Sequence, residues 1–178
     1  MSRGFPTGGP TSAGASQRTA NIIWWAFLLS LPCYLLVLLS LHARSETPAA
    51  KTLLLPFWGL ALLDFAASFV LPPWVEKGMA TRLDTRTSRQ PPPSEDDLKA
   101  ALYRSVVVQV TITAACADCI AVYGFVLGLA GAPLRTWLPF FLLAFLLLVW
   151  QKTQHPSYFQ LADEKAREIY AGYIGSQS

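Results

Sequence analysis

Four long apolar runs restrict this chain to the folds that are available to membrane-spanning proteins. They cover residues 22–41, 53–75, 105–129 and 136–150, and they contain two carboxylates between them. A helix needs about 20 apolar residues to cross roughly 30 Å of hydrocarbon. Charged residues make up 14% of the 178 residues, whereas soluble domains hold about 25%. We therefore expect an all-α bundle of four transmembrane helices.

Local composition predicts where the first two helices begin and end. Residues 1–20 are rich in Gly, Ser, Thr and Pro, which is typical of a disordered N-terminus. Two prolines and a tryptophan at positions 72–74 predict the end of the second helix. The polar residues 76–93 then form a cytoplasmic linker in this interpretation.

Similar signals divide the second half of the chain. Ser94 is followed by three acidic residues, a pattern that predicts the N-terminus of a helix. Gly131 and Pro133 predict its end and a short turn to the fourth helix. His155 and Pro156 predict a break, followed within residues 153–178 by a short C-terminal amphipathic helix. We expect His155 to be solvated or to cap a helix.

An internal repeat relates the two halves of the chain. The sequence KTLLLPFWGLALL at residues 51–63 parallels RTWLPFFLLAFL at residues 135–146, with a gap of one residue. Each copy enters its helix through a proline near the start. The pattern predicts two related helical hairpins, in residues 21–75 and 94–152, as in membrane proteins built from repeats.

The distribution of basic residues predicts how the chain crosses the membrane. Eleven of the 14 Lys and Arg residues lie before the first run, between the second and third runs, or after the fourth. Under the positive-inside rule both termini are cytoplasmic, and we expect a multi-pass protein of the bacterial inner (plasma) membrane. The basic residues suit anionic lipid headgroups. No basic domain that would bind nucleic acid is recognisable.

The two carboxylates within the apolar runs, Asp118 and Asp64, are the candidate functional residues. A charge at the bilayer centre costs at least ~2.5–3.5 kcal/mol on insertion scales. At 1.5 Å per residue, Asp118 lies ~20 Å from the cytoplasmic entry of its helix and Asp64 ~18 Å from the external entry of its own. Both therefore reach the midplane. We hypothesise that they are protonated at neutral pH or share one proton in the bundle interior.

Small residues accompany Asp118 along its helix. A stripe of alanines and glycines allows the backbones of neighbouring helices to approach closely. The packing residues expected around the site are Thr111, Ala117, Ala121, Tyr123, Gly124 and Gly128.

The sequence DCIAVYGFVLGL at residues 118–129 resembles the second helix of the proteolipid c subunit of rotary ATP synthases. The resemblance implies that Asp118 binds a proton or another ion, with Tyr123 and Gly124 as its packing partners. The whole chain is also similar to small four-helix bacterial membrane proteins with such a helix. The chain differs from the c subunit because residues 53–75 contain one glycine, Gly59, and because the cytoplasmic loop is long. The resemblance therefore implies a homo-oligomer or a larger membrane complex rather than a rotor ring.

Other function classes find little support in the sequence. It contains no nucleophile elbow, phosphate-binding loop or metal-ligand spacing, and Cys116 and Cys119 lack a second ligand pair. We therefore expect no catalytic residue, no metal and no cofactor. Two alternatives stay open. The chain is either a structural accessory subunit of a larger complex or, with less support, a transporter for a small solute.

Overall fold

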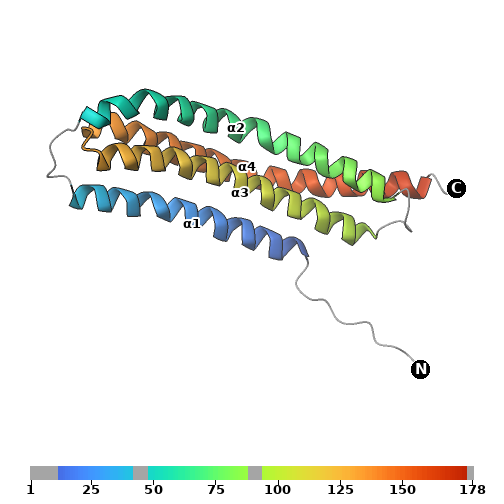
Figure 1. Cartoon of the computed structure of the whole chain (residues 1–178). Helices are drawn as coiled ribbons and strands as arrows, with labels where there is room; N and C mark the ends of the chain where they lie inside the picture. The colour runs from blue at the N-terminus through green and yellow to red at the C-terminus, as the bar shows by residue number, and fades with distance from the viewer. Residues whose placement is uncertain (1–11, 42–47, 88–93, 176–178) are drawn as a thin grey trace.

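The computed structural model describes residues 12–41, 48–87 and 94–175. These residues form four helices, α1 (Ser12–Ser40), α2 (Pro48–Thr87), α3 (Glu95–Leu129) and α4 (Leu134–Gly175), and no strand occurs in these ranges. Successive helices run in opposite directions, so that α1 begins and α4 ends at the same end of the bundle (Figure 1). The expected all-α class with four apolar helices is confirmed.

Each helix contains a stretch long and apolar enough to cross a membrane. The candidate spans are Gly14–Ser40, Lys51–Leu71, Glu95–Leu129 and Leu134–Gly172. With 40 and 42 residues, α2 and α4 are ~60 Å long at 1.5 Å per residue. Because roughly 30 Å crosses the hydrocarbon, both helices continue well beyond it. The protein is thus a multi-pass membrane protein by the length and composition of its helices.

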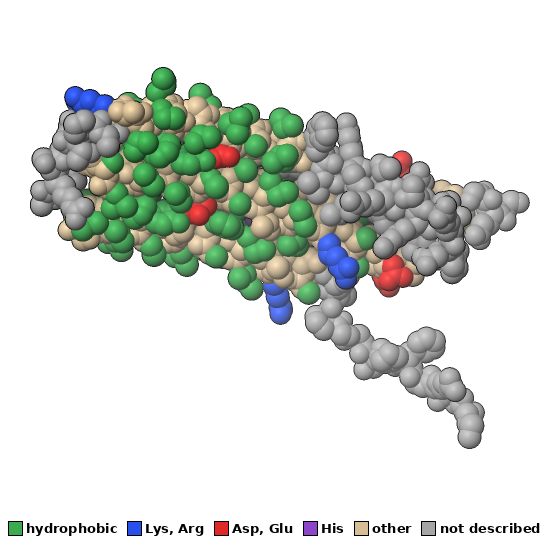
Figure 2. Space-filling model, viewed as in Figure 1, with side chains coloured by type: hydrophobic (Ala, Val, Ile, Leu, Met, Phe, Trp, Pro, Cys, Tyr) green, Lys and Arg blue, Asp and Glu red, His purple; other side chains and the backbone are tan. Residues whose placement is uncertain are grey.

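The surface of the bundle matches this assignment. Large apolar side chains such as Leu55, Ile22 and Leu36 are 82%, 68% and 66% exposed. Figure 2 shows such side chains covering the part of the bundle away from the chain ends, whereas lysine and arginine side chains lie at its borders. Exposed apolar area of this extent is rare on soluble monomers. Lipid contact accounts for it.

Helix α3 is the centre of the fold. It packs against α4, α1 and α2, whereas α1 and α2 lie on different sides of it (Figure 1). In the most apolar 18-residue stretch of α3, 44% of the residues are buried, whereas the corresponding stretch of α2 has only 11% buried. The expected first hairpin is therefore not a closely packed pair, because α1 and α2 each use α3 as their main packing surface.

Helices α3 and α4 approach each other closely at Gly124. Ala117 and Ala121 are fully buried, and an added Cβ at Gly124 would lie 2.8 Å from Phe140 Cβ and 3.0 Å from Trp137 O. Only a glycine permits this approach of two backbones. The small-residue stripe predicted from the sequence thus lies at helix interfaces.

The two ends of α3 follow the predicted signals. Ser94 caps the N-terminus, where its Oγ accepts a hydrogen bond from the Asp97 amide at 3.2 Å. At the C-terminus Gly131 adopts a positive φ of 82°, and the Ala132 amide donates to Leu127 O at 3.0 Å. This is a glycine-terminated Schellman-type end. It returns the chain directly into α4, as expected for antiparallel neighbours.

Two predicted boundaries in the first half of the chain are wrong. Helix α1 begins at Ser12, so residues 12–20 are helical rather than disordered, and Ala20 is fully buried beside Tyr103 and Val106. Helix α2 continues through residues 72 and 73 to Thr87, so the expected stop is absent and residues 76–87 of the expected linker belong to this helix. Prolines are tolerated within membrane helices, where neighbouring structure satisfies the freed carbonyls. Residues 1–11 and 88–93 lie outside the described part.

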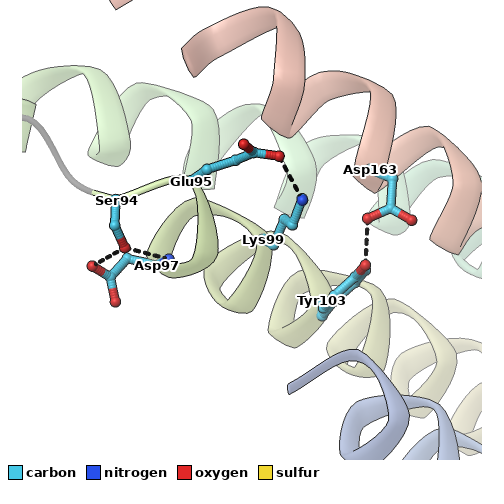
Figure 3. A network of polar contacts seen from close by, with 6 residues as sticks. All are labelled: Ser94, Glu95, Asp97, Lys99, Tyr103 and Asp163. Carbon is cyan, nitrogen blue, oxygen red and sulfur yellow. Dashed lines mark hydrogen bonds and ion pairs between the residues drawn. The ribbon is translucent and has the colours of Figure 1, made fainter. Parts of the chain in front are cut away.

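The predicted break at Pro156 is also wrong. Helix α4 runs without interruption from Leu134 to Gly175, so the C-terminal helical segment is its continuation rather than a separate helix. Tertiary contacts hold this segment against α3. The hydroxyl of Tyr103 donates to Asp163 (Figure 3), and the rings of Tyr103 and Phe159 lie 5.7 Å apart. These contacts offset the hydrogen bond that Pro156 removes.

Candidate functional site

Asp118 lies at the interface between α3 and α1. It is half-buried, and both carboxylate oxygens are close to hydroxyl groups of α1. Ser30 Oγ lies 2.7 Å from Asp118 Oδ1, and the Tyr34 hydroxyl donates to Oδ2 over 3.4 Å. Ser30 and Tyr34 face the same carboxylate because residues four apart share a helix face.

The hydroxyl of Ser30 connects Asp118 to the backbone of α1. Ser30 Oγ lies 2.7 Å from Phe27 O and 2.7 Å from Asp118 Oδ1. A hydroxyl has one proton, so it donates to one of these oxygens at a time. When it donates to Phe27 O, a protonated Asp118 donates to Ser30 Oγ. When Asp118 is ionised, Ser30 donates to the carboxylate instead. One arrangement of heavy atoms thus suits both protonation states.

Asp64 lies on the other flank of α3. It is half-buried on α2 and accepts a hydrogen bond of 2.8 Å from the hydroxyl of Tyr123 on α3. The ring of Tyr123 stacks on Phe57 of α2, with their centroids 5.4 Å apart. Asp64 and Tyr123 therefore join α2 to α3, as Ser30 and Asp118 join α1 to α3.

The structure separates the two carboxylates into different interfaces. Each has its own hydroxyl partners, and no hydrogen bond links Asp64 to Asp118 within the described residues. The pair with a shared proton is therefore not formed. Both groups are half-buried rather than enclosed. Figure 2 shows acidic side chains at the surface among apolar side chains.

The packing residues expected around Asp118 divide among several neighbours. Tyr123 bonds to Asp64 rather than packing on Asp118. Gly124 faces α4, whereas a Cβ at Gly128 would lie 2.6 Å from the Leu38 side chain of α1. The Thr111 hydroxyl donates to Val107 O within its own helix at 2.8 Å. Ala117 and Ala121 belong to the core of the bundle.

A second polar cluster, on α4, was not predicted. Gln151 is 1% exposed and donates from Nε2 to Val110 O at 2.7 Å. His155 is 6% exposed, so the prediction of a solvated or capping residue is wrong. Gln151 Oε1 and both ring nitrogens of His155 have no hydrogen-bond partner among the described residues. Gln151 and His155 are four residues apart, so their spacing could have placed both on one helix face. The predicted helix break at His155 and Pro156 kept them from being considered together.

Two further bonds attach α1 to α4. Trp24 Nε1 donates to Leu148 O at 2.8 Å in the buried interface. Lys152 donates to Asn21 Oδ1, and its Nζ lies 5.0 Å from the centroid of the Trp24 ring. The sequence alone gives no partner for the indole N–H of Trp24.

The described residues hold no group of three or more His, Cys, Asp or Glu side chains that would bind a metal ion. Comparison with known proteins gives no match among protein-family models, curated proteins or solved structures.

Proposed function

We propose that this chain is a non-enzymatic membrane protein in which Asp118 is an ion-binding carboxylate, with a proton as the bound ion. The observation that carries the proposal is the position of Ser30 Oγ, 2.7 Å from both Phe27 O and Asp118 Oδ1. Rotation of one hydroxyl adapts the site to either protonation state. No helix has to move when the proton binds or leaves.

The resemblance of residues 118–129 to the c subunit of rotary ATP synthases supports the same function. The carboxylate of that family is the ion-binding group. By this likeness the chain acts in a membrane assembly, either as a homo-oligomer or as a subunit of a larger complex. Asp64, which accepts a hydrogen bond from the Tyr123 hydroxyl, is the second protonatable group of the proposal.

The basic residues of α3 and α4 support the orientation of the chain. Lys99, Arg104, Lys152, Lys165 and Arg167 lie towards the end of the bundle where α1 begins and α4 ends. Under the positive-inside rule that end faces the cytoplasm. The bacterial inner membrane is the location that we propose.

Infrared difference spectra of the protein in lipid nanodiscs, recorded across a pH series, test the proton site. We expect a protonated-carboxyl band that Asp118→Asn removes. Asp64→Asn tests the second carboxyl separately and leaves the Asp118 band in place. Ser30→Ala shifts the band, because the carboxyl loses the oxygen to which it donates. A band that Asp118→Asn leaves unchanged refutes the proposal. In a second, chemical test of the same site, we expect Asp118 to react slowly with a carbodiimide, at a rate that depends on pH.

A structural accessory subunit is the second candidate function. The observation that favours it is that each carboxylate ties an outer helix to α3, through Ser30 and Tyr34 for Asp118 and through Tyr123 for Asp64. Asparagine at position 118 keeps one oxygen, which can accept the 2.7 Å bond from Ser30, whereas its NH2 group cannot accept the 3.4 Å bond from Tyr34. An accessory subunit therefore retains its assembly in Asp118→Asn and co-purifies with its complex in a fixed ratio. A proton-binding subunit still assembles but loses the infrared band and the carbodiimide reaction.

A further inference from the structure

A cavity of about 160 Å³ opens between α2, α3 and α4, and neither Asp64 nor Asp118 lines it. Apolar and aromatic side chains form its walls, among them Phe69 of α2, Leu102 of α3 and Trp150 of α4. Ser68, Ser105 and Gln109 supply polar atoms, and Tyr158 and Lys165 of α4 complete the lining. The cavity thus combines an apolar wall, a polar part and one cationic side chain.

Two of the polar lining residues are little exposed. Ser105 is 4% exposed and Gln109 is 8% exposed, and both line the cavity. Buried polar groups in native proteins are normally hydrogen-bonded. A bound molecule with a polar group therefore meets hydroxyl and amide groups on the α3 wall of the cavity.

The cavity lies at the border of the membrane-spanning part. Ser68 and Phe69 are near the end of the candidate span Lys51–Leu71, and Phe69 is 42% exposed to the surroundings of the bundle. Tyr158 and Trp150 are residue types that concentrate at membrane–water interfaces. A ligand in this position has access both to the acyl chains and to the headgroup layer.

The charge near the cavity selects the class of ligand. Lys165 lines it directly, and Arg104 lies one residue before Ser105 on α3. Basic pockets between transmembrane helices bind anionic lipid headgroups, and each Lys or Arg near the surface contributes about 1 kcal/mol. A volume of about 160 Å³ holds part of a headgroup or glycerol unit rather than a whole lipid.

We propose that this cavity binds an anionic phospholipid from the surrounding leaflet. Its phosphate lies near Lys165, its glycerol or headgroup oxygens reach Ser105 and Gln109, and its acyl chain follows Phe69 into the bilayer. This site is independent of Asp118, so the two proposals stand or fall separately.

The test measures the thermal unfolding midpoint of the purified full-length chain in a neutral detergent. Short-chain phosphatidylglycerol, short-chain phosphatidylcholine and inorganic phosphate are titrated in parallel. We expect phosphatidylglycerol to raise the midpoint in a saturable manner, and the other two to have little effect. Equal shifts with both lipids, or no shift at all, overturn the proposal. A shift with inorganic phosphate as large as the shift with phosphatidylglycerol identifies a soluble anion as the ligand and also overturns the proposal.

Variants locate the effect in the cavity. Lys165→Gln weakens the binding of phosphatidylglycerol about fivefold, which is the equivalent of ~1 kcal/mol. Ser105→Ala weakens it as well, with little change in the unfolding midpoint of the lipid-free protein. Arg167→Gln removes a charge from an exposed position on the same helix that does not line the cavity, and it retains the wild-type affinity. A loss in Arg167→Gln as large as in Lys165→Gln refutes a specific site.

Discussion

Replacement of Gly124 by alanine tests whether contact between backbones holds α3 against α4. The added Cβ would lie 2.8 Å from Phe140 Cβ and 3.0 Å from Trp137 O. Both atoms belong to rigid parts of α4, so they do not move aside by a change of rotamer. The two helices must separate, or the packing around Gly124 must distort.

Two opposing terms set the size of this effect. Alanine is favoured over glycine by about 1 kcal/mol in the interior of a helix. Overpacking a well-filled core costs about 1–3 kcal/mol. Gly124→Ala therefore lowers the free energy of unfolding by up to about 2 kcal/mol. At Gly59, where an added Cβ meets nothing within 4 Å, the same substitution adds up to about 1 kcal/mol. The difference between the two variants isolates the overpacking term.

The assay is reversible unfolding in mixed micelles by increasing sodium dodecyl sulfate, followed by circular dichroism and tryptophan fluorescence. Gly128→Ala gives an intermediate result, because its Cβ would meet Leu38 Cδ2 at 2.6 Å, the end of a side chain that can change rotamer. The reasoning is refuted when Gly124→Ala is as stable as Gly59→Ala.

Substitutions at three further positions test single contacts with the same unfolding assay. Trp24→Phe removes the donor to Leu148 O and costs about 1 kcal/mol; an unchanged free energy of unfolding contradicts a buried bond between α1 and α4. Ser94→Ala removes the cap of α3 and costs about 1 kcal/mol, whereas Ser94→Gly costs only a few tenths, and equal losses argue against a capping role. His155→Leu replaces a buried ring whose nitrogens have no partner among the described residues, and we expect a gain of about 1 kcal/mol. A loss in this variant indicates that the ring is hydrogen-bonded.

The sequence predicts the number of helices well, for a clear physical reason. Long apolar runs have few stable conformations in lipid other than helices. The ends of the helices were harder to predict. Pro72, Pro73 and Pro156 are strong local stop signals, yet α2 and α4 continue through them. At Pro156 tertiary packing overrides the signal, as the contact between Tyr103 and Asp163 illustrates.

The rest of the candidate site could not be predicted from the sequence, because it depends on how the helices pack side by side. Nothing in the local pattern around Ser30 or Tyr34 indicates that α1 packs beside Asp118, because a helical period gives a face but not its neighbour. The same holds for Tyr123, which the resemblance assigned to Asp118 and which bonds to Asp64 instead. Partners within one helix are thus predictable from spacing, whereas partners between helices require the packed structure.

The central position of α3 has a consequence for synthesis of the chain. Helices α1 and α2 leave the ribosome before the helix on which both pack. During that interval Asp64 enters the bilayer without Tyr123, since the tyrosine is 59 positions further along the chain. The nascent hairpin must therefore tolerate an unpaired acidic group in lipid, or be shielded by the insertion machinery, until α3 arrives.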